Sequence, residues 1–280
     1  MFDGRRFLMV VVLGLSVFAT KPEGRCAETD EPVVDGVPLT KLLEQASLSL
    51  IPRAPTRGKR DEGWTPDPTA ENAVRNLGTN ALPYLVHLVQ DDAIGRSKLA
   101  LTAFRLLGSK ATPAIPALEQ VGMTSERTDT VSGVLQALHY IGKDALPALE
   151  RLSTNPVCRV GAVAAIMELG KAGANIQPVF GEVIKPGDAS AEMAVLGLRH
   201  YQATAALPLL TNVLTSSQPK MRKTALEVIR QFNGQSRPIL PALIDRLYDP
   251  DKDVRDSAVY VLSQVAPEMF VTNSAPARVK

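Results

Sequence analysis

The 280-residue sequence has few aromatic residues, few cysteines and few histidines. Aromatic residues make up only 5%, while hydrophobic residues as a whole reach 45%, so the core is expected to be aliphatic. An aliphatic core of Leu, Ala and Val favours closely packed helices over an aromatic-rich sandwich. The two cysteines, Cys26 and Cys158, exclude a disulfide framework. Packing must therefore stabilise the fold.

A strong charge of either sign is also missing, since 31 Lys and Arg residues stand against 29 Asp and Glu residues. Proteins that bind nucleic acid or anionic lipid usually carry a clear excess of positive charge. The near balance therefore argues against a nucleic acid partner.

The first twenty residues, MFDGRRFLMVVVLGLSVFAT, differ from the rest of the chain. Arg5 and Arg6 precede an apolar run over 7–18, and small residues follow. The run is shorter than the roughly 20 apolar residues of a membrane span and is typical of a secretory signal. We expect a signal peptide within 1–27, cleaved after Ala19 or Ala27. The protein would then be exported to the periplasm or the exterior, without stable membrane insertion.

A proline-centred phrase, such as IGKDALPALERL at 141–152, returns six times. Its prolines are Pro83, Pro116, Pro147, Pro178, Pro208 and Pro241. They are separated by 30 to 33 residues, and a period this regular indicates a stacked array of structural units.

Each unit reads as two helices joined by a tight turn. The residue before the proline and the residue three positions after it are apolar in eleven of twelve cases, which indicates one helix face. The proline must lie in the first turn of this second helix, where its missing N–H costs nothing. Glycines expected to end the first helix in a left-handed conformation are Gly78, Gly108, Gly142, Gly170 and Gly234. Asn80, Asp144 and Asn175 are the expected caps of second helices.

A single helix pair cannot bury its own apolar face, so the pairs are expected to stack. The predicted fold is all-α, a right-handed α-solenoid of the armadillo-like type, with about six pairs over 69–248 and a terminal helix at 253–265. The predicted solenoid domain spans 67–266, after a proline-rich linker and cap at 28–66 and before a flexible tail at 267–280. Within the linker, a helix at 38–46 and Trp64 are expected to cover the first pair.

The phrases GKDALPALERL, SGVLQALHYI and DPDKDVRDSAVYVL resemble HEAT repeats, especially the short bacterial arrays of the phycobilisome-lyase type. The resemblance spans 69–265, about 70% of the chain. It implies a solenoid whose second helices line the concave side. A related HEAT family, deoxyhypusine hydroxylase, holds iron with His-Glu pairs. Since no His-Glu dipeptide occurs in this sequence, the resemblance does not imply that activity.

Four aspartates, Asp249, Asp251, Asp253 and Asp256, form an acidic cluster. A calcium loop of the EF-hand type would require glycine at Val254 and glutamate at Tyr260, so we expect no metal there. The aspartates instead suit the capping of the last helix and the positive end of its dipole.

Three other features have ordinary structural interpretations. His139 and His200 lie two repeats apart, at about 20 Å, too far to share a metal. Cys158, near a helix start, fits a buried small hydrophobe better than a reactive thiol. The basic run KMRK at 220–223 is expected to be a solvated helix face. We therefore expect no catalytic, metal or cofactor site.

One position of the second helix, four residues after each proline, is polar in every unit. These residues are His87, Gln120, Arg151, Glu182, Asn212 and Asp245, and we call them the ladder. They should lie on the side of the helix away from the core. The sequence predicts a non-catalytic envelope scaffold that binds another protein along this ladder. The alternative, from the resemblance, is a chromophore-handling protein similar to bilin lyases.

Overall fold

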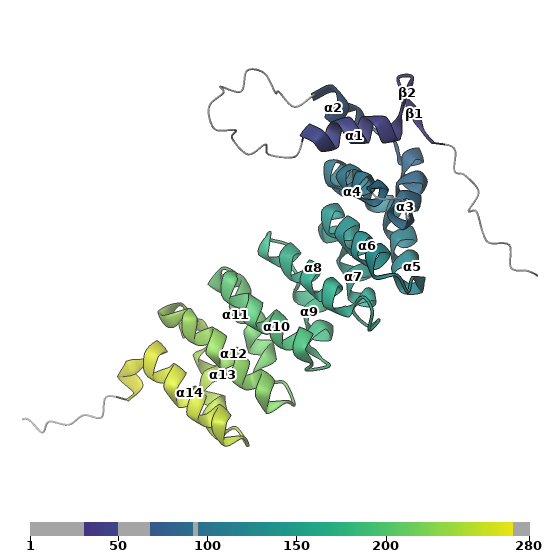
Figure 1. The fold of residues 1–280 in the computed structure, drawn as a ribbon. Coiled ribbons are helices and arrows are strands. Elements are labelled where there is room, and N and C mark those ends of the chain that lie inside the picture. The colour runs from purple at the N-terminus through teal and green to yellow at the C-terminus, as the bar shows by residue number, and fades with distance from the viewer. Residues whose placement is uncertain (1–30, 50–67, 92–94, 271–280) are drawn as a thin grey trace, which may run out of the picture.

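The computed structural model describes residues 31–49, 68–91 and 95–270. The expected signal peptide, Trp64 and residues 271–280 lie outside the described residues. Within these ranges the chain is an all-α solenoid with one small hairpin, as Figure 1 shows. None of the helices in the described ranges is both long and apolar enough to span a bilayer.

The solenoid consists of two layers of helices. The first layer contains α2 (Pro68–Arg75), α4 (Arg96–Leu107), α6 (Thr128–Ile141), α8 (Arg159–Lys171), α10 (Ala189–Gly197), α12 (Pro219–Gln231) and α14 (Lys252–Val265). The second layer contains α3 (Leu82–Gln90), α5 (Ile115–Thr124), α7 (Leu146–Leu152), α9 (Gln177–Ile184), α11 (Ala203–Val213) and α13 (Leu240–Asp245). Six pairs and a terminal helix are therefore confirmed.

Short 3-10 helices join many of these elements. Those before second-layer helices are η1 (Thr79–Ala81), η2 (Gly108–Ala114), η3 (Lys143–Ala145) and η5 (Asn233–Ile239). The others are η4 (Leu198–His200), η6 (Arg246–Tyr248) and η7 (Pro267–Met269). This use agrees with the usual role of 3-10 turns as connectors.

The periodic leucines form the core. The residues three positions after each pre-proline site are fully buried in all six pairs: Leu85, Leu118, Leu149, Phe180, Leu210 and Leu243. Five of the six prolines occupy the first turn, as predicted. Pro208 is the exception and lies inside α11, which begins at Ala203, three residues after the end of the 3-10 helix η4 at His200.

The predicted left-handed glycines are confirmed at Gly108 (φ 54°) and Gly142 (φ 99°). The prediction is wrong at Gly170, because α8 continues through it to Lys171 and the turn uses Gly173 (φ 98°) instead. Gly170 is small for another reason, since a Cβ there would lie 2.5 Å from the Tyr201 hydroxyl.

The prediction of left-handed glycines is also wrong at Gly78 and Gly234. Gly78 has an extended conformation (φ −72°). After α12 the left-handed residue is Asn233 (φ 48°) rather than Gly234. Asparagine tolerates this region better than other side chains.

None of the three predicted caps occupies an N-cap position: Asn175 accepts the Gln177 backbone N–H at 3.1 Å, but the N-cap of α9 is Ile176. Asn80 and Asp144 fall inside the 3-10 turns η1 and η3, so Ala81 and Ala145 take the N-cap positions without a side-chain bond. At η1 and η3, the 3-10 turn therefore places the N-cap one residue after the predicted cap.

The first pair is covered by α1 (Leu39–Ser49), which packs against α2 and α4. Leu39, Leu42, Leu43 and Ala46 are all buried, so the predicted capping helix is confirmed. A hairpin of β1 (Val33–Val34) and β2 (Val37–Pro38) precedes it and was not predicted from the sequence. Its turn, Asp35-Gly36, has positive φ at both residues, as two-residue hairpin turns require.

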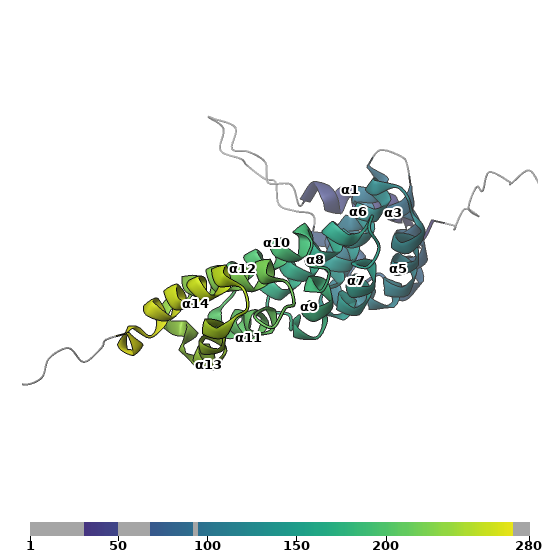
Figure 2. The ribbon, with the colours of Figure 1, turned by 90° about the horizontal axis from the view of Figure 1, so that it is seen from below.

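The array bends toward its first layer. In Figure 1, α4 and α6 border the hollow, while α3 and α5 lie on the outer side. Figure 2 shows α8, α10, α12 and α14 along one edge, opposite the second layer. In the amino-terminal repeats, the expectation that the second helices line the concave side is therefore wrong.

The helices of the first layer pack closely against one another. Consecutive first-layer helices contact one another from α4 to α14. At Gly161 of α8, an added Cβ would lie only 2.6 Å from the Leu135 side chain of α6, so only a small residue allows this approach.

Candidate functional site

The ladder residues lie on the outer, second layer. Gln120, Arg151, Glu182, Asn212 and Asp245 are exposed, and His87 is half-buried. The prediction that this position faces away from the core is therefore confirmed. Since the second layer is the outer one, however, the ladder does not line the hollow of the array.

Two charges of the ladder already have partners within the chain. Arg151 donates through Nη2 to Glu119 at 2.7 Å, and Lys185 lies 3.3 Å from Glu182. The hydrogen bond that Arg151 donates to Glu119 is the main cause that raises the pKa of Arg151. These pairs are mostly exposed, so each contributes little to stability.

The aspartate cluster separates into different roles. Asp251 caps α14 by accepting the Val254 backbone N–H at 3.1 Å, as predicted. Asp249 is buried and accepts two hydrogen bonds from Arg222, at 2.8 and 2.6 Å. The cluster does not gather into a chelating group, and the described residues contain no set of three or more His, Cys, Asp or Glu side chains placed to hold a metal.

The Arg222–Asp249 contact is an ion pair between consecutive repeats. An equivalent pair joins Arg159 to Asp188, with Nε–Oδ2 at 2.5 Å. Each arginine also donates to the carbonyl six residues before it, Ser153 or Ser216. The arginine thus links its own inter-helix loop to the loop of the next repeat.

This link corrects the interpretation of the KMRK run. Lys220 and Lys223 are accessible and pair with Glu192 and Asp253, but the Arg222 side chain is buried. The run is therefore not a wholly solvated face.

Cys158 is buried, as predicted, and its Sγ lies 3.1 Å from the carbonyl of Gly122. Burial raises the pKa of the Cys158 thiol. A raised pKa reduces the thiolate fraction and hence the reactivity.

The histidines lie in separate places, as expected. His200 accepts a hydrogen bond from Arg199 Nε at 3.1 Å on the short η4 turn. His139 belongs to α6 of the first layer, where its ring lies 5.7 Å from that of Tyr140. His139 adjoins a hollow of the surface.

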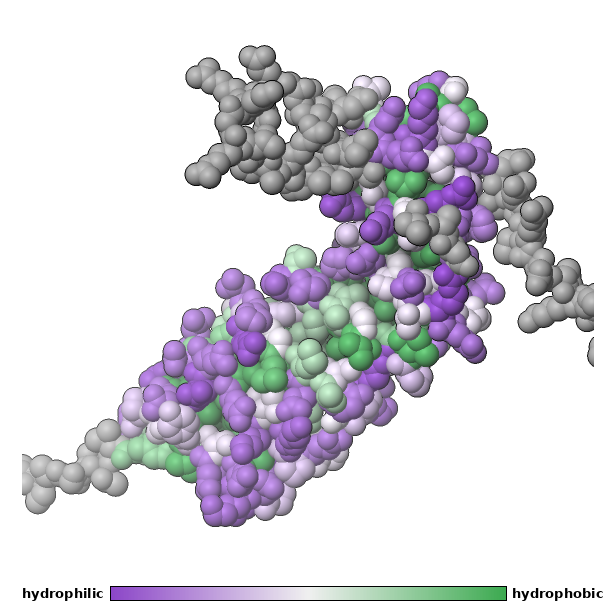
Figure 3. All heavy atoms as spheres, viewed as in Figure 1, coloured by the Kyte–Doolittle hydropathy of each residue, from purple (hydrophilic) through white to green (hydrophobic). Residues whose placement is uncertain are grey.

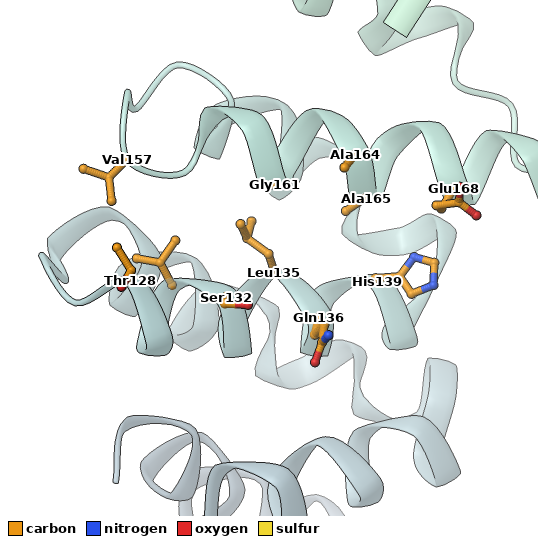
Figure 4. A pocket seen from close by; sticks show the side chains of 11 residues that line it. Thr128, Ser132, Leu135, Gln136, His139, Val157, Gly161, Ala164, Ala165 and Glu168 are labelled. Atoms are coloured by element: carbon orange, nitrogen blue, oxygen red, sulfur yellow. The ribbon is translucent and has the colours of Figure 1, made fainter. Parts of the chain in front are cut away.

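That hollow is a groove of about 350 Å³ between α6 and α8. Figure 4 shows the two helices running in parallel, with Leu135, Gly161, Ala164 and Ala165 along the middle of the groove. Thr128 and Val157 lie at one end, and His139 and Glu168 lie at the other. The groove is therefore aliphatic along its length and polar at both ends.

Exposed apolar side chains lie at the groove and on the next helix of the first layer. Val160 of α8 is 66% exposed, Met193 of α10 is 68% exposed, and Val157 is 51% exposed. Figure 3 shows hydrophobic residues gathered in the middle of this face, between hydrophilic residues toward both ends of the array. We call Val157, Val160, Met193 and the α6–α8 groove the apolar inner surface.

A related groove between α12 and α14 has a different character. It is lined by Glu227, Arg230, Asp256 and Tyr260, with a volume of about 290 Å³. The Arg230 guanidinium lies 5.7 Å from the centre of the Tyr260 ring, in cation–π geometry. The α12–α14 groove is thus lined by large and charged side chains, whereas the α6–α8 groove in the central repeats is lined by small aliphatic ones.

The sequence contains a signal for the apolar inner surface in a first-layer helix rather than in the second helices. The segment RVGAVAAIMELGK of α8 has apolar or small residues on every side. A helix with that pattern is buried all round or presents an apolar face to a partner. The ladder lies on the second layer, whereas α8, with its apolar pattern, belongs to the first layer.

The polar end of the groove contains an unsatisfied group. His139 Nδ1 is inaccessible to solvent and has no hydrogen-bond partner among the described residues. Glu168 lies at the same end and is 3.8 Å from Lys171, in a pair with both side chains more than half exposed. Buried polar atoms in native proteins are nearly always satisfied, so a missing partner calls for an explanation.

Comparison with known proteins agrees with this architecture. Residues 185–263 match the sequence model of a family described as HEAT repeats. This part of the chain consists of HEAT repeats. The matched segment runs from the end of α9 to α14, and the preceding pairs have the same two-layer construction. The phycobilisome-lyase subtype remains a prediction.

Two solved structures illustrate the similarity. A designed armadillo repeat protein in complex with the peptide (KR)4 is 15% identical, covering 81% of this chain and 99% of its own, with a TM-score of 0.28. Human deoxyhypusine hydroxylase in complex with glycerol is 16% identical, covering 81% and 96%, with a TM-score of 0.29. Neither value of identity or TM-score assigns a ligand or an activity to this chain. No curated protein matches it.

Proposed function

We propose that this HEAT-repeat protein is a non-catalytic scaffold that binds another protein through its apolar inner surface. The observation that carries the proposal is the exposure of Val160 and Met193 beside an aliphatic groove on the inner layer. Contiguous exposed apolar side chains on a soluble protein are typical of an interaction site. Solenoids offer such extended concave surfaces to their partners.

The ladder is the second candidate surface, on the outer layer. Its six polar side chains vary in charge along the array, which suits a recognition surface, although exposed helix positions are polar in any case. The two surfaces lie on opposite layers, so variants of each can be compared directly.

A crosslinking capture from envelope extract tests both surfaces. The wild type is compared with Val160→Glu/Met193→Glu on the inner layer and with Arg151→Glu/Glu182→Arg on the ladder. We expect the inner variant to lose a protein that the wild type and the ladder variant both retain. Loss only in the ladder variant would assign the site to the outer layer. Identical capture by all three folded proteins would contradict the scaffold proposal.

Both variants should remain folded. The Arg151 and Glu182 side chains are exposed, so their reversal should change the free energy of unfolding by about 0.5 kcal/mol per site or less. Val160 and Met193 are mostly exposed and bury little surface. Urea denaturation followed by circular dichroism checks this, and unfolding of the ladder variant would show that our assignment of its face is wrong.

The site of action we propose is the cell envelope, on the basis of the predicted signal peptide at 1–27. Mass spectrometry of the mature N-terminus from a periplasmic fraction tests it. Cleavage after Ala19 or Ala27 is expected, and an intact N-terminus in the cytoplasm would contradict export.

Handling of a bilin chromophore is the second candidate function. It rests on the resemblance to lyase-type arrays and on a groove whose volume lies within the range of small-molecule sites. Titration with biliverdin should then shift its absorption spectrum in the wild type and not in Ala164→Trp, whose indole would fill the groove. An unchanged spectrum would rule this function out.

A further inference from the structure

The α6–α8 groove is electrically polarised along its length. Both helices run in the same direction, so their amino ends meet at Thr128 and Val157, and their carboxyl ends meet near His139 and Glu168. The carboxyl end of a helix carries a partial negative charge, and the amino end a partial positive charge. The two dipoles therefore add, and the Glu168 carboxylate strengthens the negative end.

Other charges reduce this polarity only in part. Lys171 lies 3.8 Å from Glu168, but both side chains are more than half exposed, so the pair is weak in water. Asp129 stands in the first turn of α6 and offsets some of the positive end. An occupant with a positive end toward Glu168 remains favoured.

The His139 side chain lies at this negative end, and its Nδ1 is inaccessible to solvent, so recognition of an occupant here falls to the Glu168 carboxylate. The first turn of an α-helix has free backbone N–H groups and a positive partial charge together.

We propose that the α6–α8 groove binds one amphipathic α-helix of a partner protein, lying antiparallel to α6 and α8. The amino end of the bound helix lies at His139 and Glu168, and its carboxyl end lies at Thr128 and Val157. This inference rests on the proposed scaffold function and names the segment that the scaffold recognises.

The dimensions of the groove fit this occupant. Its lining on α6 runs from Thr128 to His139, a length of about 17 Å at 1.5 Å per residue. A helix of three to four turns covers that length. Its apolar stripe would contact Val131, Leu135 and Ala165, and helix-in-groove recognition of this kind uses anchors one turn apart.

The test begins with a displayed library of helical peptides of about four turns, with fixed apolar residues at helical spacing and random residues elsewhere. The full chain serves as bait, and Ala164→Trp serves as the counter-selection protein. Ala164 is exposed on the edge of the groove, so its replacement fills the groove without entering the core. Ala117→Trp is the control, since Ala117 is an exposed alanine in the first turn of α5 on the outer layer.

We expect selected helices to bind the wild type and Ala117→Trp equally, and to bind Ala164→Trp at least tenfold more weakly. Glu168→Lys should weaken binding about fivefold at low salt, because it reverses the charge at the negative end. A spin label on the amino end of the peptide should broaden the amide signals near His139 and Glu168. A label on the carboxyl end should broaden those near Thr128.

Failure to select amphipathic helices, or equal binding to Ala164→Trp, would overturn the proposal, and so would the reverse spin-label pattern. Concentration-dependent dimerisation of the wild type that Ala164→Trp abolishes would assign the groove to a second copy instead. If no helix is selected but the envelope capture still loses its protein in Val160→Glu/Met193→Glu, the scaffold function stands and only the helical occupant is wrong.

Discussion

Two junctions of this array use the same ion pair in different surroundings. Between α8 and α10, the Arg159 and Asp188 side chains are 14% and 41% exposed. Between α12 and α14, the Arg222 and Asp249 side chains are 6% and 0% exposed. The comparison shows that one repeated contact can contribute differently to stability, because burial decides how much water screens the charges.

The pKa values of the two aspartates reflect this difference. At Asp188, the hydrogen bond from Arg159 is the largest influence and lowers the pKa. At Asp249, burial is the largest influence and would raise the pKa, but hydrogen bonds from Arg222 and the Asp251 backbone lower it overall. The buried aspartate therefore stays charged only because its partners are in place.

Removal of the buried arginine should have the largest effect. Arg222→Ala leaves the buried Asp249 with only Arg246 at 3.4 Å and the Asp251 backbone N–H at 3.0 Å, so we expect a loss of about 3 kcal/mol in the free energy of unfolding. Hydrogen exchange of α12 and α14 measures the loss locally. Arg222→Met/Asp249→Asn removes both charges and should recover most of it, and equal destabilisation by the double variant would contradict the role of the uncompensated charge.

The next largest effect should be the loss of stability at the Arg222–Asp249 junction in acid. The lowered pKa of Asp249 means that the folded state binds this proton less tightly than the unfolded state, whose aspartates titrate near 3.9. The stabilisation is present above that pH and is lost as the pH falls toward the folded pKa. Urea midpoints at pH 7 and pH 3 should therefore differ more in the wild type than in Arg222→Met/Asp249→Asn. An equal decrease in both proteins would show that other groups cause the acid sensitivity.

Removal of the arginine should have the smallest effect at the exposed Arg159–Asp188 junction. Arg159→Ala removes hydrogen bonds to Asp188, Ser153 and Val183, but Asp188 remains accessible to water. We expect a loss of about 1–2 kcal/mol, measured by hydrogen exchange of α8 and α10. A loss as large as that of Arg222→Ala would mean that burial does not distinguish the two junctions.

Much of the fold could be predicted because its signals are local. The spacing of the prolines fixed the number of helix pairs, and Leu85, Leu149 and Leu210 lie in the core as their positions required. The turn residues were less predictable. Gly142 took the expected left-handed conformation, but Gly170 stayed helical since Tyr201 packs against it.

The candidate site could be predicted only in part. The ladder is polar and faces away from the core, as local periodicity implies, yet it occupies the outer layer. The apolar inner surface depends on α6 and α8 lying side by side, and Val131 and Gly161 come from different repeats. The unusual apolar pattern of α8 was visible, but its position on the inner side was not.

The sequence by itself determined the all-α class, the two-helix unit and its leucine core, because helical periodicity and first-turn prolines act within a few residues. The tertiary structure decided which layer bends inward, which aspartate is buried and where a groove opens. Those properties depend on contacts between residues about 27 to 32 positions apart, such as Arg222 with Asp249 and Arg151 with Glu119. Only the stacking of repeats brings such residues together and removes water from them.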